Sequence, residues 1–138
     1  AQGIFFGLTH NTKAAELCRA VLEGVAFAFA DGQQALIASG TQIDQVSVIC
    51  GGSRSMLWGK ILASVLNKTL TYRKGAEVGP ALGAARLAKI GHTKQNPADV
   101  CYSGDIDHVI EPDKHMHDYY SVQHLKYQQI YQSLKAHF

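Results

Sequence analysis

"VICGGSRSMLWGKIL", residues 48–62, joins two apolar patterns across a pair of glycines. Residues 46–50 form a short run rich in β-branched side chains, which predicts a strand. After the glycines, apolar side chains return at three- and four-residue steps, and this spacing predicts a helix that Asn67 ends in the left-handed conformation. Residues 69–72 alternate polar and apolar side chains and predict a second strand. The stretch therefore belongs to a strand–helix–strand unit.

A long amphipathic helix is predicted before this unit, over residues 12–39, because apolar side chains recur there at helical spacing. Asn11 or Thr12 can cap its start, Gly40 can end it, and Gly32 is a candidate position for a break or a kink.

Further helices are predicted after the unit. In "EVGPALGAARLAKIG", Gly79 takes the capping position, Pro80 the first helical position and Gly91 the position just past the end. Its many small side chains give a low-profile surface that can pack on a sheet or approach a ligand. Residues 91–116 are predicted to be loop-rich, and residues 117–136 to form an outer, partly solvated helix.

The composition fits one folded domain over residues 1–138, since 46% of the residues are hydrophobic. A formal net charge of +2 without blocks of like charge predicts no nucleic-acid or membrane partner. No apolar run approaches the roughly 18 residues that span a bilayer, and no signal peptide is recognised, so we expect a cytoplasmic protein. Cys18, Cys50 and Cys101 are odd in number and far apart, which predicts free thiols.

The glycine corner is the candidate binding site. The first turn of a helix has backbone N–H groups without partners and a partial positive charge, and glycine lets a ligand approach the backbone without obstruction by Cβ. Gly51 and Gly52, with the hydroxyls of Ser53 and Ser55, are therefore candidate nucleotide contacts. The alternative is a simple tight turn in which one serine caps the helix. The spacing matches neither the dinucleotide-binding pattern nor the P-loop.

Three stretches, in order, carry a resemblance to a known family: "RAVLEGVAFAFADG" (residues 19–32), "VICGGSRSMLWGKILASVLN" (48–67) and "EVGPALGAARLA" (77–88). They resemble segments of the C-terminal domain of the FGGY carbohydrate kinases. The third, with "TYRKG" just before it, is especially similar to the bacterial kinases of D-xylulose. "GIFFGLTHNT" and "YQQIYQSL" also match that pattern, so the resemblance covers nearly the whole chain.

The resemblance implies an α/β fold, namely part of the C-terminal lobe of a ribonuclease H-like (actin/hexokinase-type ATPase) fold that lacks its first strands. It implies an enzyme that, with ATP and Mg2+, phosphorylates the primary hydroxyl of the pentulose D-xylulose. Another FGGY kinase, for glycerol, gluconate or ribulose, is the alternative. In the family the Gly-Gly segment lies against the adenosine of ATP, which places Gly51, Gly52 and Ser55 at the nucleotide with Ser53 adjacent.

The sequence departs from the family pattern in two places and lacks part of it. Members often have a third glycine where this chain has Cys50, and an Ala-Asp pair where it has Ala63 and Ser64. The resemblance places the sugar site and the general base upstream of Ala1, so no residue here is assigned a catalytic role. The chain also begins without Met. We therefore expect a C-terminal fragment of a kinase that is inactive alone.

Other side chains have ordinary alternatives to a functional role. Arg54, Arg73 and Lys74 could pair with phosphate but fit solvated surface cations. Trp58 could line an adenine pocket but also fits a core position. The histidines of the C-terminal third are spread over a loop and a helix without a cysteine pair, so no metal site is predicted.

A hypothesis of another class is a non-catalytic interaction domain, in which the Tyr- and His-rich C-terminal helix binds a partner or dimerises. A partial lobe would leave a sheet edge or an apolar face uncovered, and such surfaces favour association. We therefore expect homo-oligomers.

Overall fold

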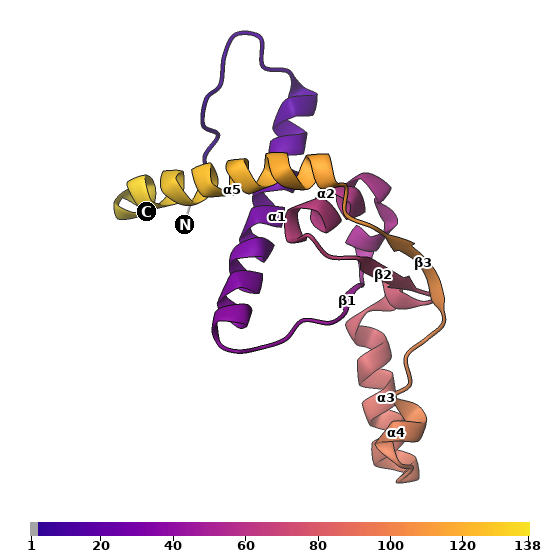
Figure 1. Cartoon of the computed structure of the whole chain (residues 1–138). Helices are drawn as coiled ribbons and strands as arrows, with labels where there is room; N and C mark the ends of the chain where they lie inside the picture. The colour runs from indigo at the N-terminus through magenta and orange to yellow at the C-terminus, as the bar shows by residue number, and fades with distance from the viewer. Residues whose placement is uncertain (1–2) are drawn as a thin grey trace.

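A computed structural model describes residues 3–138, in which a small sheet is combined with helices (Figure 1). In chain order the elements are α1 (Ala14–Ala38), β1 (Val46–Val48), the 3-10 helix η1 (Gly51–Arg54), α2 (Met56–Leu66), β2 (Leu70–Arg73), the 3-10 helix η2 (Ala76–Val78), α3 (Pro80–Thr93), α4 (Pro97–Val100), β3 (Ile106–Ile110), α5 (Lys114–Leu134) and the 3-10 helix η3 (Lys135–His137). No helix within these described residues has the length and apolar content that crossing a membrane requires.

The sheet has the strand order β1-β2-β3. β1 and β2 are parallel, with Val46 opposite Leu70, and α2 connects them. The predicted strand–helix–strand unit is therefore confirmed, and Asn67 ends α2 with φ 50°, in the left-handed region, as expected. β3 pairs antiparallel with β2.

The core lies where α2 packs against the sheet and where α1 and α5 pack against α2. Gly59 allows the close approach of α2, because a Cβ at that position would meet the Tyr72 hydroxyl and the Ile110 side chain. The cluster of buried residues is drawn from five elements: Ala26, Phe27, Ile61, Leu62, Ala63, Leu70, Tyr72, Ile110 and Tyr120. We call α1, α2, α5 and the sheet the body.

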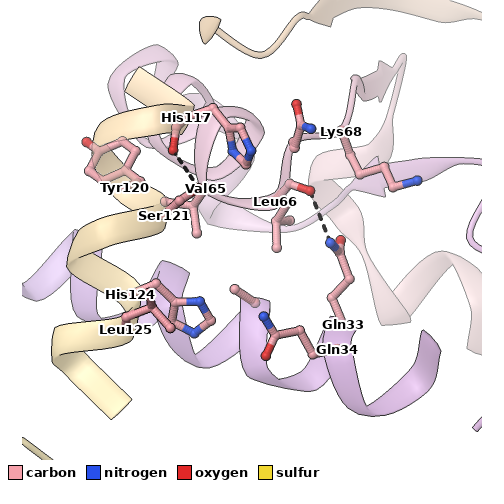
Figure 2. A pocket seen from close by; sticks show the side chains of 12 residues that line it. Gln33, Gln34, Val65, Leu66, Lys68, His117, Tyr120, Ser121, His124 and Leu125 are labelled. Carbon is pink, nitrogen blue, oxygen red and sulfur yellow. Dashed lines mark hydrogen bonds between the residues drawn. The ribbon is translucent and has the colours of Figure 1, made fainter. Parts of the chain in front are cut away.

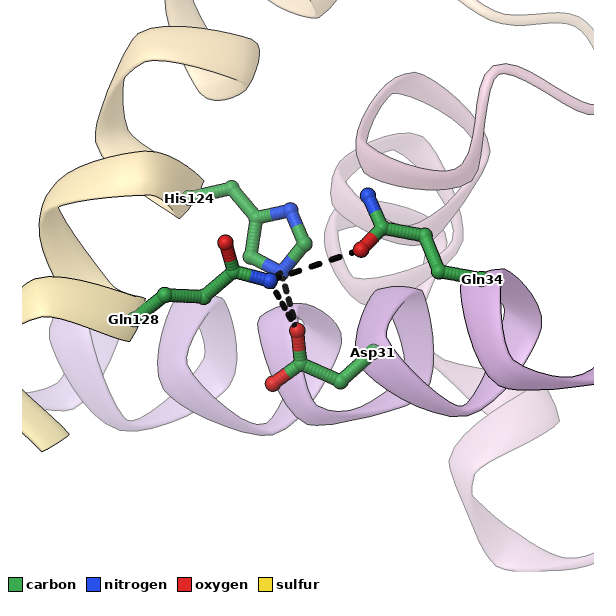
Figure 3. Close-up of polar contacts among 4 residues, drawn as sticks. All are labelled: Asp31, Gln34, His124 and Gln128. Carbon is green, nitrogen blue, oxygen red and sulfur yellow. Dashed lines mark hydrogen bonds and ion pairs between the residues drawn. The ribbon is translucent and has the colours of Figure 1, made fainter. Parts of the chain in front are cut away.

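α5 crosses α1, and a polar cluster joins the two helices (Figure 3). His124 is buried, its Nε2 lies 2.8 Å from Asp31 Oδ1, and its ring stacks on Phe27 at 5.5 Å between centroids. The Gln128 amide donates to the same carboxylate oxygen. The polar side chains of the last helix thus serve the packing between two helices as well as solvation.

α3 and α4 extend away from the sheet (Figure 1), and no residue of α3 is buried. Its small side chains therefore do not pack on the sheet formed by the described residues. We call residues 80–104 the arm.

Several predicted helix ends and one predicted loop are wrong. α1 begins after Lys13, whose N–H donates to Glu16 Oε2 at 2.7 Å, so neither Asn11 nor Thr12 is the cap. The side chain of Glu16 accepts a hydrogen bond from this N–H, which is one half of a capping box, and the N–H of Glu16 donates to the carbonyl of Lys13 at 3.0 Å. α1 also runs without a break through Gly32.

The end of α3 and the segment that follows it also differ from prediction. α3 continues past Gly91 to Thr93, and Lys94 takes the left-handed conformation with φ 57°. Residues 91–116, expected to be loop-rich, contain α4 and β3. β3 escaped prediction because its partner β2, and not its own sequence pattern, fixes it in the sheet.

Candidate functional site

The glycine corner, residues 51–55, follows the carboxyl end of β1. Since β1 and β2 are parallel, the turn after β2 reaches the same edge of the sheet. The two turns touch there, because the N–H of Cys50 donates to the carbonyl of Ala76 at 3.1 Å. In open α/β sheets, ligands bind outside the carboxyl ends of the strands. The corner therefore lies at the edge where a ligand is expected.

The backbone of the corner is open on the side of Gly51. A Cβ placed on Gly51 would meet no atom within 4 Å, and Gly51 is exposed. Gly52 is different, since a Cβ there would lie 3.3 Å from Nε1 of Trp58. The backbone at Gly51 is thus open to a close approach, whereas packing against the indole is a sufficient reason for Gly52.

The two serines of the corner both have local partners. Ser55 accepts a hydrogen bond from the N–H of Trp58 at 3.2 Å and caps α2, as the alternative reading predicted. Ser53 is half-buried and donates to the carbonyl of Cys50 at 2.6 Å. The four predicted contact residues therefore lie together, with the serines holding the shape of the corner.

The other candidates for nucleotide contact divide into two groups. Arg54 is exposed at the corner itself. Arg73 donates to the carbonyl of Gly104 at 2.7 Å, and Lys74 lies 4.0 Å from the Asp105 carboxylate, so both hold the start of β3 beside β2. Of these three cations, only Arg54 has no side-chain hydrogen bond or ion pair to another residue within 3–138.

Trp58 has the core position that was the ordinary alternative for it. It is half-buried and packs against the core cluster, while the edge of its indole lies under Gly52. The indole therefore supports the corner from the side of the body.

A hollow of about 480 Å³ with a mixed polar and apolar lining is found at the opposite end of α2, where α1, α2 and α5 meet (Figure 2). Gln33 Nε2 donates to the carbonyl of Leu66 at 3.0 Å across it, and Lys68 donates to the carbonyl of Ile43 at 3.1 Å. The first hydrogen bond joins α1 to the end of α2, and the second joins the segment after α2 to the loop that follows α1. An 11-residue helix separates the hollow from the corner by roughly 16 Å, so the two are different places.

Three acidic residues of α1 have structural partners. Glu16 caps the helix, Asp31 contacts α5, and Glu23 accepts hydrogen bonds from Arg19 at 2.7 Å and from the Tyr120 hydroxyl at 2.9 Å. Burial raises the pKa of Tyr120, an effect that its hydrogen bond from Arg19 opposes. None of these carboxylates lies at the corner.

The three cysteines of the described residues are free; Cys18 and Cys101 are exposed and Cys50 is half-buried. Within residues 3–138 no group of three or more His, Cys, Asp or Glu side chains is arranged to hold a metal ion.

Sequence reasoning did not single out the turn after β2 as part of the site. The sequence signal for this turn was the pair of glycines in "KGAEVG". In the structure both glycines have positive φ, 75° at Gly75 and 50° at Gly79.

Comparison with known proteins relates the chain to one family. The sequence profile described as "FGGY family of carbohydrate kinases, C-terminal domain" matches residues 1–92. The xylulose kinase of Escherichia coli (strain K12) is 53% identical over 90 residues, which are 65% of this chain and 19% of that protein. The xylulose kinase of Klebsiella pneumoniae is 39% identical over 136 residues, 98% of this chain and 28% of that protein.

A solved structure shares the fold along the whole chain. The crystal structure described as a "xyloylose kinase" from Brucella ovis superposes with a TM-score of 0.86 and 36% identity, over 100% of this chain and 29% of that one. The chain therefore spans less than a third of the relatives that it matches.

Proposed function

The chain belongs to the FGGY family of carbohydrate kinases, and on that premise we propose that it forms the adenosine-contacting part of an ATP-dependent kinase of D-xylulose. Relatives named xylulose kinase, at 53% and 39% identity, support this substrate. We further propose that residues 1–138 form one partial C-terminal domain of that enzyme.

The observation that carries the proposal is the open backbone at Gly51. It lies at the carboxyl end of a parallel strand and before the 11-residue helix α2, whose first turn adds a partial positive charge. No partner within the described residues is found for the N–H groups of Gly51 and Gly52. A flat, polar ligand such as adenosine can therefore lie against this backbone, with Ser53, Ser55 and Trp58 keeping the corner in shape.

The role of this chain in the reaction is to position the nucleotide. ATP supplies the phosphoryl group, and transfer depends on alignment and on a base that orients the acceptor hydroxyl. The described carboxylates of α1 are engaged in helix contacts away from the corner. We therefore propose that the base and the sugar site belong to other parts of the kinase and that residues 1–138 alone are inactive.

The metal ion, the cellular location and the oligomeric state are further parts of the proposal. The described residues do not fit a resident metal site, so we assign no Mg2+ ligand to them and derive no step through the ion. We propose that the enzyme is cytoplasmic. We also propose that it forms homo-oligomers, since large apolar side chains such as Phe6 and Phe29 are exposed in this chain.

A chimera tests the nucleotide half of the proposal. The upstream part of the Klebsiella pneumoniae xylulose kinase is joined to residues 1–138 in place of its own matching segment. We expect D-xylulose-dependent ADP release from the chimera and none from residues 1–138 alone, measured with a coupled ADP assay. Sugar-dependent turnover by residues 1–138 alone, or a folded chimera that does not bind ATP, would contradict the proposal.

The acceptor requires a separate experiment, because the chimera takes its sugar site from the Klebsiella protein. The full-length polypeptide that carries this segment is assayed with D-xylulose, ribulose, glycerol and gluconate. The highest kcat/KM is expected for D-xylulose. A higher value for any of the other three would move the protein to another branch of the family.

A further inference from the structure

Cys50, which precedes the corner, has an unusual backbone conformation. Its φ is 69° and its ψ is −168°, a region that residues with a side chain rarely adopt. Its N–H donates to the carbonyl of Ala76 at 3.1 Å, in the turn after β2. The fold therefore holds a cysteine in a conformation suited to glycine, and a neighbouring turn contributes to holding it.

Gly79 lies where the Cys50 side chain points. A Cβ built on Gly79 would be 2.5 Å from Cys50 Sγ and 3.7 Å from Cys50 Cβ, and the φ of Gly79 is 50°. The sulfur thus occupies the space that any larger residue at position 79 would need. Gly75, in the same turn with φ 75°, has no atom within 4 Å of its Cβ position. The contact is specific to one of the two glycines.

This contact connects the two turns at the carboxyl ends of β1 and β2. α3 begins directly after Gly79 and has no buried residue of its own, so the turn is a main attachment of its first residues to the body. The sulfur lies toward Gly79, whereas the space beside Gly51 contains no protein atom within 4 Å of the Cβ position.

We propose that Cys50 and Gly79 are a matched pair of positioning residues that fix the glycine corner against the turn after β2 and so set the affinity for the nucleotide. The inference rests on the proposed function, because it assumes that the corner contacts ATP. The absence of a side chain at Gly79 leaves the space that the Cys50 sulfur occupies beside the corner.

A double-mutant cycle in the chimera tests the pair. Gly79→Ala is introduced with Cys50 present and again with Cys50→Gly, and each variant is compared with its own parent. With Cys50 present, we expect Gly79→Ala to raise KM for ATP roughly tenfold more than it does in the Cys50→Gly background, because only the first combination brings Cβ against sulfur. KM for D-xylulose is expected to stay within about twofold in all variants, since a positioning effect at the corner acts on the nucleotide alone.

Gly75→Ala is the matched control, because it adds the same methyl group at a positive φ without a contact. Its effect is expected to be equal in the two backgrounds. Equal damage by Gly79→Ala in both backgrounds, in KM or in the yield of folded protein, would overturn the pairing, as would no damage with Cys50 present. A parent chimera without kinase activity would instead refute the proposed function.

Discussion

The body and the arm are built from similar helices but are held in different ways. α2 has five buried residues in 11, whereas α3 has none in 14. The body makes its own core from five elements, while the arm is attached by the turn that precedes α3 and by the hydrogen bond from Arg73 to the carbonyl of Gly104. The described residues therefore account for the stability of the body, and the arm contributes little to it.

The largest expected contrast comes from removing apolar volume in each region. Ile61, in the core, is 3% exposed, and Leu87, in the arm, is 70% exposed. Ile61→Ala is expected to lower the free energy of unfolding by about 3 kcal/mol, because it removes a buried side chain and leaves a cavity. Leu87→Ala is expected to change it by less than about 0.5 kcal/mol. Urea titration of residues 1–138 measures both, and similar losses would show that the arm has a core of its own.

Adding a methyl group gives the next contrast. Gly59→Ala brings a Cβ to 2.5 Å from Ile110 Cδ1 and onto the Tyr72 hydroxyl, so a loss of about 2 kcal/mol is expected from overpacking. Gly83→Ala in α3 meets nothing within 4 Å and is expected to stabilise the helix by up to about 1 kcal/mol. Thermal melts of the two variants are compared. A stable Gly59→Ala variant would mean that α2 does not pack this closely on the sheet.

Alkaline pH is expected to weaken the body. Burial raises the pKa of Tyr72, Tyr120 and Tyr127 above the ordinary value. Above roughly pH 10 the unfolded chain releases these phenolic protons before the folded chain does, so the stabilisation that they contribute is full below that pH and is lost as pH rises through the folded pKa values. Tm measured between pH 8 and 11.5 should fall at the alkaline end. A constant Tm over this range would contradict the burial of these side chains.

The smallest effect is expected at the hydroxyl of Tyr72. It is buried and has no hydrogen-bond partner among the described residues. Tyr72→Phe is therefore expected to raise the free energy of unfolding by about 1 kcal/mol, since an unsatisfied polar group leaves the core. Urea titration checks this, and a clear loss of stability would show that the hydroxyl has a partner.

The elements that carry their own signals were predicted from the sequence. α2 has its cap at Ser55 and its left-handed end at Asn67, and Pro80 begins α3 as predicted. These positions depend on local backbone chemistry, which a single sequence contains. The family resemblance likewise identified the fold and the kinase family that the comparisons confirm.

The features that escaped prediction depend on residues distant in sequence. β3 exists because β2 pairs with it, and the α1–α5 contact depends on Asp31 and His124, 93 residues apart. At the site, the four residues predicted to contact nucleotide remain a prediction. The contact of Cys50 with Gly79 could not be derived, because it follows from the path of two turns at one edge of the sheet.

The glycine corner belongs to the body and touches the turn that leads into the arm. Substitutions at Gly51 and Gly52 distinguish two reasons for a glycine there, contact with a ligand and packing against Trp58. Neither glycine has positive φ, so a valine is sterically allowed by the backbone at both positions. Gly52→Val places side-chain atoms against Trp58 and is expected to lower Tm. This variant measures packing in the body and serves as the comparison for Gly51.

Contact between adenosine and the corner is measured by the KM for ATP of the Gly51→Val chimera, taken together with the Tm of that variant. A Cβ at Gly51 meets no protein atom within 4 Å, so the fold is expected to be retained, with Tm within about 2 °C of the parent. If adenosine lies against this backbone, KM for ATP rises roughly tenfold or more, about 1.4 kcal/mol of binding, while KM for D-xylulose is unchanged. An unchanged KM for ATP in this folded variant would contradict the account.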